Sequence, residues 1–360
     1  MKFLFIVQGE GRGHISQAIA LSQILNKNNH VLVCSLIGKS RFRKVPDYFF
    51  NKINSPYICF DSPNFIRDKK NKQIKIFLSF IYNIIISPSF FYSIFIIKKA
   101  VKKYKPDIII NFYDIIGGLY NFIYRPKCKF ICIGHQYFMQ HTVYQMPDNF
   151  KISKFLLNTY TKLTSLKAYK KIGLSLYPAN DCIPKKIYIS PPLIRAQILN
   201  NTGQNKDFFL IYLLNAGYIN DIAEWHKKHD KEQFYIFIDD SIPKNFNYKN
   251  DNFIIKKLEY DEYIKIFISC KGVITNAGFE TPAEAIYLGK PLLIKPAGNH
   301  FEQLCNANDI KKLGVAMVGT ELNIDEFIKF SEKYIYNPYL IKWISSGNEK
   351  IIDIITKNDI

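Results

Sequence analysis

TNAGFETPAEAIYLGKPLLIKPAGNHFEQLCNA, residues 275–307, decides the fold of this chain. It predicts a strand end, a tight glycine turn, a short helix, a buried strand, a Pro-Ala-Gly loop and a second helix. Glu284 lies on the first predicted helix and Gln303 on the second. We expect both side chains at the carboxyl edge of one parallel sheet, which is where open α/β sheets bind ligands. A carboxylate suits the two hydroxyls of a ribose, and an amide suits the hydroxyls of a hexose.

The TPAE motif that begins at Thr281 also has a purely structural interpretation. It fits a capping box, with Thr281 as the N-cap and Glu284 as the third helical residue. Gln303 alone could likewise be a solvated helix residue. The surrounding pattern favours a binding site, because small residues at 277–278 precede the helix and a Gly-Lys-Pro break at 289–291 ends it.

These residues together resemble the donor-binding signature of glycosyltransferases with two facing Rossmann-like domains, the GT-B architecture. The resemblance is to the MurG-like group (family 28) and to the UDP-glucosyltransferases (family 1). It implies that Glu284 holds the ribose hydroxyls and that Gln303, with Asn306 nearby, holds the donor sugar. It also implies that Ala277 and Gly278 lie under the pyrophosphate.

Two places in the predicted donor site depart from the family pattern. Asn276 stands where such enzymes often carry Arg or His, so a positive contact to phosphate is missing there. The loop after the first strand of the second domain, Asn215-Ala216-Gly217, has fewer Gly and Ser residues than its counterparts in relatives. The resemblance still implies that Asn215 and Gly217 approach the phosphate or the sugar.

The composition predicts two globular domains in a reducing compartment. The chain has 360 residues and 48% hydrophobic residues, which is enough for about two cores. Its seven cysteines form no C-x-x-C motif, and we expect Cys128 and Cys132 in a core. The N-terminus, MKFLFIVQGEG, has too short an apolar run for a signal peptide and predicts a buried strand instead. We therefore expect a cytoplasmic protein.

The formal net charge of +19 does not by itself identify a partner. Basic chains often bind nucleic acid or anionic membranes. Here the basic residues are spread along the chain, and Lys, Ile, Asn, Tyr and Phe are all abundant, which is typical of A+T-rich codon usage. No nucleic-acid-binding module is recognisable, so we expect no specific nucleic-acid partner.

Residues 76–97, IFLSFIYNIIISPSFFYSIFII, carry no charge and are long enough for a membrane span. Pro88 divides the segment, Asn83 adds polarity, and lysines flank both ends. We therefore expect a helical hairpin rather than a span. It could cover the sheet, or it could dip into an anionic membrane surface.

Strands and helices alternate in both halves, which predicts an α/β fold with mostly parallel sheets. Buried strands are expected at 2–8, 30–38, 105–114, 129–137, 207–214, 233–239 and 252–258. Residues 188–193 are expected to be an extended break. The predicted organisation is an acceptor-side Rossmann-like domain (1–190), a linker (191–206), a nucleotide-sugar-binding Rossmann-like domain (207–335), and terminal helices (336–360) that pack back towards the first domain.

A glycine-rich loop, Gly9-Glu10-Gly11-Arg12-Gly13, joins the first predicted strand to the first helix. Glycines allow close backbone approach, and helix N-terminal amides favour an anion or a developing negative charge. The spacing is not that of the dinucleotide-binding fingerprint. Followed by His14 at the N-terminus of the chain, the loop resembles the first-domain loop of the same glycosyltransferases. This implies that Gly11, Arg12 and Gly13 lie on the acceptor side.

The resemblance also implies that His14 is the general base that takes the proton of the acceptor hydroxyl. Asp114, at a predicted strand end, is the candidate that orients the imidazole. Family 1 enzymes carry an aspartate at a similar place, whereas MurG-like enzymes lack it. Structural alternatives are a helix-capping or acceptor-binding His14 and an Asp114 that only caps a strand end. We expect His135, near the end of the strand at 129–137, to line the acceptor side.

The leading interpretation is an inverting glycosyltransferase. It would move a hexose, such as N-acetylglucosamine or glucose, from a UDP-sugar to a hydroxyl of a sugar, lipid-linked or small-molecule acceptor, in cell-envelope polysaccharide or glycolipid synthesis. We expect no cofactor beyond the UDP-sugar co-substrate and no metal, because the histidine spacing matches no ligand pattern. A lipid-linked acceptor would place the protein peripherally on the inner face of the membrane.

Two other functions fit the same fold. One is a nucleotide-sugar 2-epimerase, although its first-loop signature is absent. The other is a non-catalytic nucleotide-sugar-binding protein, against which Glu284, Gln303 and His14 all argue.

Overall fold

The structure is a computed structural model and describes residues 1–40, 44–63, 76–201, 205–213, 217–238, 242–243, 246–298 and 300–357. The chain forms two compact units. The first contains residues 1–196 and 343–360, and the second contains residues 197–342. The chain passes from the first unit to the second after Ala196 and returns to the first after Lys342.

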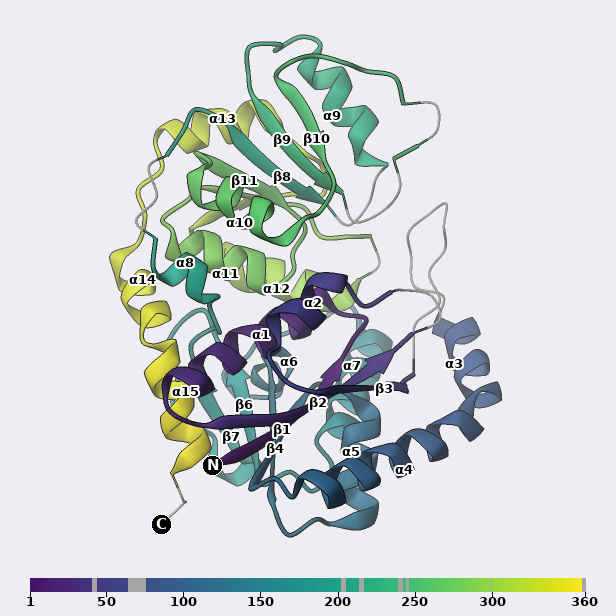
Figure 1. Cartoon of the computed structure of the whole chain (residues 1–360). Coiled ribbons are helices and arrows are strands. Elements are labelled where there is room, and N and C mark those ends of the chain that lie inside the picture. The colour runs from purple at the N-terminus through teal and green to yellow at the C-terminus, as the bar shows by residue number, and fades with distance from the viewer. Residues whose placement is uncertain are drawn as a thin grey trace. The chain divides into compact units, whose positions relative to one another are not determined.

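Seven parallel strands form the sheet of the first unit, in the order β3-β2-β1-β4-β5-β6-β7 (Figure 1). They are β1 (Lys2–Gln8), β2 (Val31–Lys39), β3 (Tyr57–Asp61), β4 (Ile108–Phe112), β5 (Lys129–Gly134), β6 (Lys170–Leu174) and β7 (Ile187–Ser190). The strand order reverses between β1 and β4, and this reversal is the usual ligand-binding point of such a sheet. The predicted parallel α/β class is confirmed.

The sequence suggested that residues 188–193 are an extended break, but part of this segment is a strand. Residues 187–190 form the edge strand β7, which pairs with β6 and buries Ile187 and Ile189. Pro191 and Pro192 follow immediately and end the strand, because proline cannot donate to a ladder. The two prolines predict a break in the sequence pattern, and the four-residue strand before them was therefore not predicted.

Helices cover both faces of this sheet. The elements of the first unit are α1 (Arg12–Lys27), α2 (Asp47–Lys52), α3 (Ile76–Ile85), α4 (Ser87–Tyr104), α5 (Ile115–Tyr124), α6 (His135–Phe138), α7 (Lys151–Thr164), the 3-10 turn η1 (Ile183–Lys185) and α15 (Gly347–Thr356), and α8 (Ala196–Leu199) begins at its boundary. On one face, Leu4 and Ile6 share a core with α4 and α5. Because side chains alternate along a strand, Phe3 and Phe5 face the other side.

The uncharged segment 76–97 forms α3 and the first part of α4. Pro88 lies in the first turn of α4, where a proline is tolerated. Ile94 and Ile97 enter the core under the sheet. Figure 1 shows α3 turning away from α4 at an angle. Within the described parts of the chain, no helix is both long enough and apolar enough to cross a membrane.

The C-terminal segment belongs to the first unit. Helix α15 contacts α1 and β7. Lys170 is buried, and its Nζ donates to the carbonyls of Ile354 and Lys357, each at 3.0 Å. A cation at the C-terminal end of a helix is favourable, because the last carbonyls carry partial negative charge.

Six parallel strands form the sheet of the second unit, in the order β10-β9-β8-β11-β12-β13. They are β8 (Phe209–Leu213), β9 (Phe234–Ile238), β10 (Phe253–Lys256), β11 (Gly272–Thr275), β12 (Leu292–Ile294) and β13 (Ala316–Val318). The helices are α9 (Tyr218–His226), α10 (Tyr260–Ser269), α11 (Glu280–Tyr287), α12 (Phe301–Lys312) and α13 (Ile324–Glu332), and α14 (Pro338–Ser345) begins in this unit and ends in the first. Here the order reverses between β8 and β11, so the motif at 275–307 begins at the second reversal.

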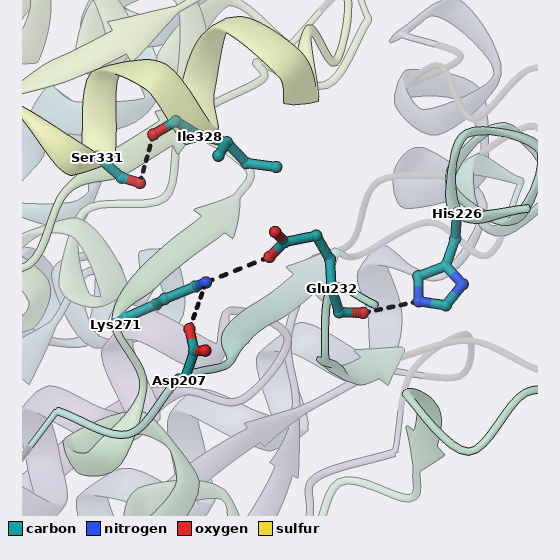
Figure 2. Close-up of polar contacts among 6 residues, drawn as sticks. All are labelled: Asp207, His226, Glu232, Lys271, Ile328 and Ser331. Carbon is teal, nitrogen blue, oxygen red and sulfur yellow. Dashed lines mark hydrogen bonds and ion pairs between the residues drawn. The ribbon is translucent and has the colours of Figure 1, made fainter. Parts of the chain in front are cut away.

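Charged and polar contacts lie at the amino edge of the second sheet (Figure 2). Lys271, just before β11, donates from Nζ to Asp207 at 2.6 Å and to Glu232 at 3.2 Å. The carbonyl of Glu232 accepts from Nε2 of the buried His226 at 2.7 Å, so Nδ1 of that ring accepts from the Tyr248 hydroxyl. These contacts join the starts of three strands and leave the carboxyl edge to other residues.

Candidate functional site

The glycine loop of the first unit lies at the carboxyl end of β1, beside the strand reversal. A Cβ on Gly9 would come within 2.5 Å of the Gly38 carbonyl at the end of β2. A Cβ on Gly11, the N-cap of α1, would come within 2.9 Å of the His14 imidazole. Arg12 and Gly13 form the first turn of α1. At least two of these glycines are therefore required by protein packing itself.

His14 is nearly buried on α1 and stacks on the ring of Tyr113, with ring centroids 5.3 Å apart. Burial lowers the pKa of His14 to about 4, and the hydrogen bond to Gln17 opposes this shift only partly. Nδ1 lies 3.4 Å from Oε1 of Gln17. Because an amide oxygen only accepts, Nδ1 carries the proton and Nε2 keeps its lone pair. Nε2 makes no hydrogen bond to the part of the chain that the structure describes.

The sequence led us to expect that Asp114 orients His14, but the structure shows a different role for Asp114. Its Oδ1 accepts from the amides of Ile116 and Gly117, and it is the N-cap of α5. Its Oδ2 accepts from the Ser62 hydroxyl at 2.7 Å. The structural alternative for Asp114, a cap, is the observed one. The carboxyl is fully buried, and burial raises its pKa to about 6 although the three hydrogen bonds lower it.

Gln17 and Tyr113 contact His14, and neither residue was predicted from the sequence. Gln17 lies one helical turn after His14, a spacing that brings two side chains to one face of a helix. Tyr113 has a φ of +60°, which is strained for a bulky residue. Its hydroxyl lies 2.7 Å from Oγ1 of Thr161 on α7. The strained backbone and this hydrogen bond together hold the Tyr113 ring against the imidazole.

His135 opens the short helix α6 rather than ending a strand. It is buried, and its Nδ1 lies 2.7 Å from the carbonyl of Leu174. The carbonyl fixes Nδ1 as the protonated nitrogen. This bond joins the ends of β5 and β6 at the same carboxyl edge, so His135 has a structural role there.

In the second unit, Glu284 is buried inside α11. The capping box, which was the structural alternative for this motif, is not observed, because α11 begins at Glu280 with Phe279 as its N-cap, and no side chain caps it. Glu284 is therefore not held at a helix start by the pairing that the capping box requires. The capping box therefore does not explain why this carboxylate is buried.

The turn between β11 and α11 is fixed by two asparagines. Asn276 donates from Nδ2 to the carbonyl of Lys295 at 2.8 Å, which joins the ends of β11 and β12. Asn306 donates from Nδ2 to the carbonyl of Ala277 at 3.0 Å, while its buried Oδ1 has no partner among the described residues. A Cβ on Gly278 would meet nothing within 4 Å. The space beside Gly278 is open, whereas Asn276 and Asn306 hold the turn itself.

Gln303 lies in the first turn of α12 and supports the Pro-Ala-Gly loop. Its side-chain Oε1 accepts from the backbone amide of Ala297 at 2.7 Å. The backbone amide of Gln303 donates to Nδ1 of His300, the N-cap of α12. Its Nε2 makes no hydrogen bond to any described residue. The amide oxygen therefore orders the loop, and the amide NH2 is left to donate to a ligand.

The remaining predicted donor residues add less. Gly217 is an exposed N-cap of α9. Asn215 lies outside the described residues. As for metals, no group of three His, Cys, Asp or Glu side chains with the arrangement of a metal site occurs in the described ranges.

Comparisons with known proteins agree with this architecture. The family model described as Glycosyl transferase family 1 matches residues 1–334. No curated protein matches the chain. The similar solved structures have low sequence identity to this chain, so the likeness shows the fold alone. This fold is that of GT-B glycosyltransferases.

Three solved structures illustrate this likeness. The first is UGT2 of Phytolacca americana complexed with UDP-2-fluoro-glucose and pterostilbene, at 15% identity and a TM-score of 0.62, covering 98% of this chain and 94% of that one. MurG of Acinetobacter baumannii has 13% identity and a TM-score of 0.57, with 99% of each chain covered. SsfS6 of Streptomyces sp. SF2575, complexed with thymidine diphosphate, has 11% identity and a TM-score of 0.58, covering 98% of this chain and 96% of that one.

Proposed function

Because this chain belongs to glycosyl transferase family 1 and is a GT-B glycosyltransferase, we propose that it transfers a hexose from a UDP-sugar to an acceptor hydroxyl with inversion. The observation that carries this proposal is the neutral, nearly buried imidazole of His14. Its Nδ1 faces an amide oxygen, and its Nε2 has no protein partner among the described residues. This is the state that a general base needs before the reaction.

In the proposed reaction the acceptor oxygen forms a bond to the anomeric carbon of the donor sugar. The bond from that carbon to the phosphate oxygen breaks on the opposite face, and its electron pair leaves with UDP. The acceptor proton moves to Nε2 of His14. The positive charge then lies on a ring that stacks on Tyr113, and Gln17 accepts from its other nitrogen. One displacement with one base gives inversion at the anomeric carbon.

We propose Glu284, Gln303 and Gly278 as the main donor contacts. Glu284 is a buried carboxylate inside a helix with no capping role, which suits a ribose diol. Gln303 has an amide NH2 left for a sugar oxygen, and Gly278 leaves room beside the turn. Asn276, Ala277 and Asn306 then act by fixing that turn.

The finer features of the activity are part of the same proposal. UGT2 was solved with a UDP-sugar analogue, which supports a UDP-sugar donor, and SsfS6 was solved with thymidine diphosphate. We propose that UDP-glucose or UDP-N-acetylglucosamine is the donor and that no metal or other cofactor takes part. The acceptor would be a sugar, lipid-linked or small-molecule hydroxyl in cell-envelope polysaccharide or glycolipid synthesis. A lipid-linked acceptor would bring the protein to the inner face of the membrane.

The experiment is UDP release from a panel of UDP-sugars and hydroxyl acceptors, with wild type, His14→Ala and His229→Ala. We expect His14→Ala to lower turnover about 100-fold or more, because a positioned base contributes roughly 10²–10⁴ to rate. UDP affinity should stay unchanged, since His14 is in the other unit. His229→Ala, which changes a partly exposed histidine, is the control. Full turnover in His14→Ala would reject His14 as the base, and an altered free sugar would identify an epimerase.

A further inference from the structure

Helix α7 exposes the side of itself that a surface helix normally buries. Ile152 is 76% exposed and Phe155 is 67% exposed, and Leu156 beside them is also exposed. These residues follow the i, i+3, i+4 spacing of one apolar face. The residues that α7 turns inward include two buried threonines, Thr161 and Thr164. Tyr160 also packs against the core on this inner side, and the apolar residues at 152–156 stay uncovered.

The helices near α7 in the first unit also expose apolar side chains. Helix α3 exposes Leu78, Ile81 and Ile85 at helical spacing, and α4 exposes Phe91, which is 72% exposed, and Tyr92. Of the 22 large apolar side chains exposed among the described residues, 14 lie between residues 78 and 156. Helix α5 packs against both α4 and α7, and α3 packs against α4. Exposed apolar residues gathered in this way mark an interaction site.

The charges on these helices identify the kind of partner. Helices α3, α4, α5 and α7 contain no Asp or Glu, although the chain has 30 acidic residues. Their lysines are Lys98, Lys99, Lys102 and Lys103 on α4 and Lys151, Lys154 and Lys162 on α7. The ammonium groups lie beside apolar rings, with Lys98 Nζ 4.5 Å from the Tyr124 ring centroid and Lys99 Nζ 4.6 Å from that of Phe95. Exposed apolar side chains among lysines, on helices without acidic residues, are typical of segments that lie on an anionic bilayer.

We propose that the exposed faces of α3, α4, α5 and α7 form one docking surface for an anionic lipid bilayer. The apolar side chains enter the boundary of the acyl chains, and the lysines contact the headgroups. The surface rests on the proposed peripheral location, and it names α7 as a contact beyond the uncharged segment 76–97. No residue proposed for catalysis belongs to this docking surface.

The test is flotation of the full chain with phosphatidylcholine vesicles and with mixed phosphatidylcholine–phosphatidylglycerol vesicles, at low and high salt. We expect binding to the anionic vesicles, weaker at high salt because exposed charges are screened. The double variant Ile152→Ser/Phe155→Ser should bind at least roughly tenfold more weakly, because two large apolar side chains are lost from the contact. The matched control, Ile335→Ser/Tyr339→Ser, removes two exposed side chains from the second unit and should bind like wild type.

Three results would overturn the proposal: no binding to anionic vesicles, equal binding of the α7 variant, or equal loss in the control. Self-association that the α7 variant abolishes, without vesicle binding, would instead identify a second copy as the occupant. Thermal unfolding and UDP binding are measured on every variant, so a folding defect is seen directly. His14→Ala should bind vesicles normally. Vesicle binding without UDP turnover would therefore reject the proposed reaction and keep the surface.

Discussion

Two buried titratable groups at the carboxyl edge of the first sheet should affect stability in opposite directions between pH 4 and pH 6.5. Burial lowers the pKa of His14 from 6.5 to about 4 and raises the pKa of Asp114 from 3.8 to about 6. Each shift exceeds two pKa units, and one unit corresponds to about 1.36 kcal/mol. Each group should therefore change the free energy of unfolding by about 3 kcal/mol over its own pH range.

The sign follows from which state binds more protons. Between pH 6.5 and pH 4 the unfolded chain protonates His14 and the folded protein does not, so His14 lowers stability as the pH falls. Between pH 3.8 and pH 6 the folded protein protonates Asp114 and the unfolded chain does not, so Asp114 lowers stability as the pH rises. The two effects nearly cancel in wild type, and removing either group should reveal the other.

The assay is urea unfolding of wild type, His14→Phe and Asp114→Asn at intervals from pH 4.5 to pH 7.5. His14→Phe keeps a ring against Tyr113 but cannot titrate, and Asp114→Asn keeps an oxygen for the α5 amides. Relative to wild type, His14→Phe should gain stability as the pH falls from 6.5, by up to about 3 kcal/mol. Asp114→Asn should lose relative stability as the pH falls from 6 towards 4, by a similar amount. A difference between His14→Phe and wild type that stays constant across this range would refute the argument that burial keeps the imidazole neutral.

Two further predictions concern activity. Glu284→Ala should weaken UDP binding by about 1.5–3 kcal/mol, the usual cost of a hydrogen bond to a charged group, and Glu284→Gln should weaken it less; calorimetry with UDP measures both, and normal binding by a folded Glu284→Ala would show that Glu284 does not hold the ribose. The acidic limb of kcat/KM should lie near pH 4, where His14 gains its proton, and a limb near pH 6 that disappears in Asp114→Asn would instead make Asp114 the controlling group.

The sequence predicted the elements that are long or strongly patterned. The strands at 2–8 and 233–239 and the strand–helix order of 275–307 are confirmed, because continuous apolar runs between turn residues are clear signals. β13 has only three residues, and so short a strand has too few positions to show a period, and β3 was also not predicted. The organisation of parallel strands was therefore predictable, whereas the full count of strands was not.

The immediate surroundings of His14 show the same limit at the level of single residues. Asp114 precedes a helix, and aspartate before a helix is a common N-cap, so its structural role had a visible signal. Gln17 also had one, since it is three residues after His14 on a predicted helix. Tyr113 had none, because no sequence pattern reports that a strand end will adopt a left-handed backbone.

The glycines of the two carboxyl edges support the division of roles between the units. At Gly11 a side chain would collide with the imidazole of His14. The side chain proposed as the base therefore occupies the space beside this glycine. At Gly278 a side chain would meet nothing within 4 Å, so the turn of the second unit has room beside its backbone. Close packing keeps the imidazole neutral, since burial is what lowers its pKa. A bulky diphosphate and sugar need open space near backbone amides and a few fixed polar groups. The packed edge thus suits the base and the open edge suits the donor, as we propose.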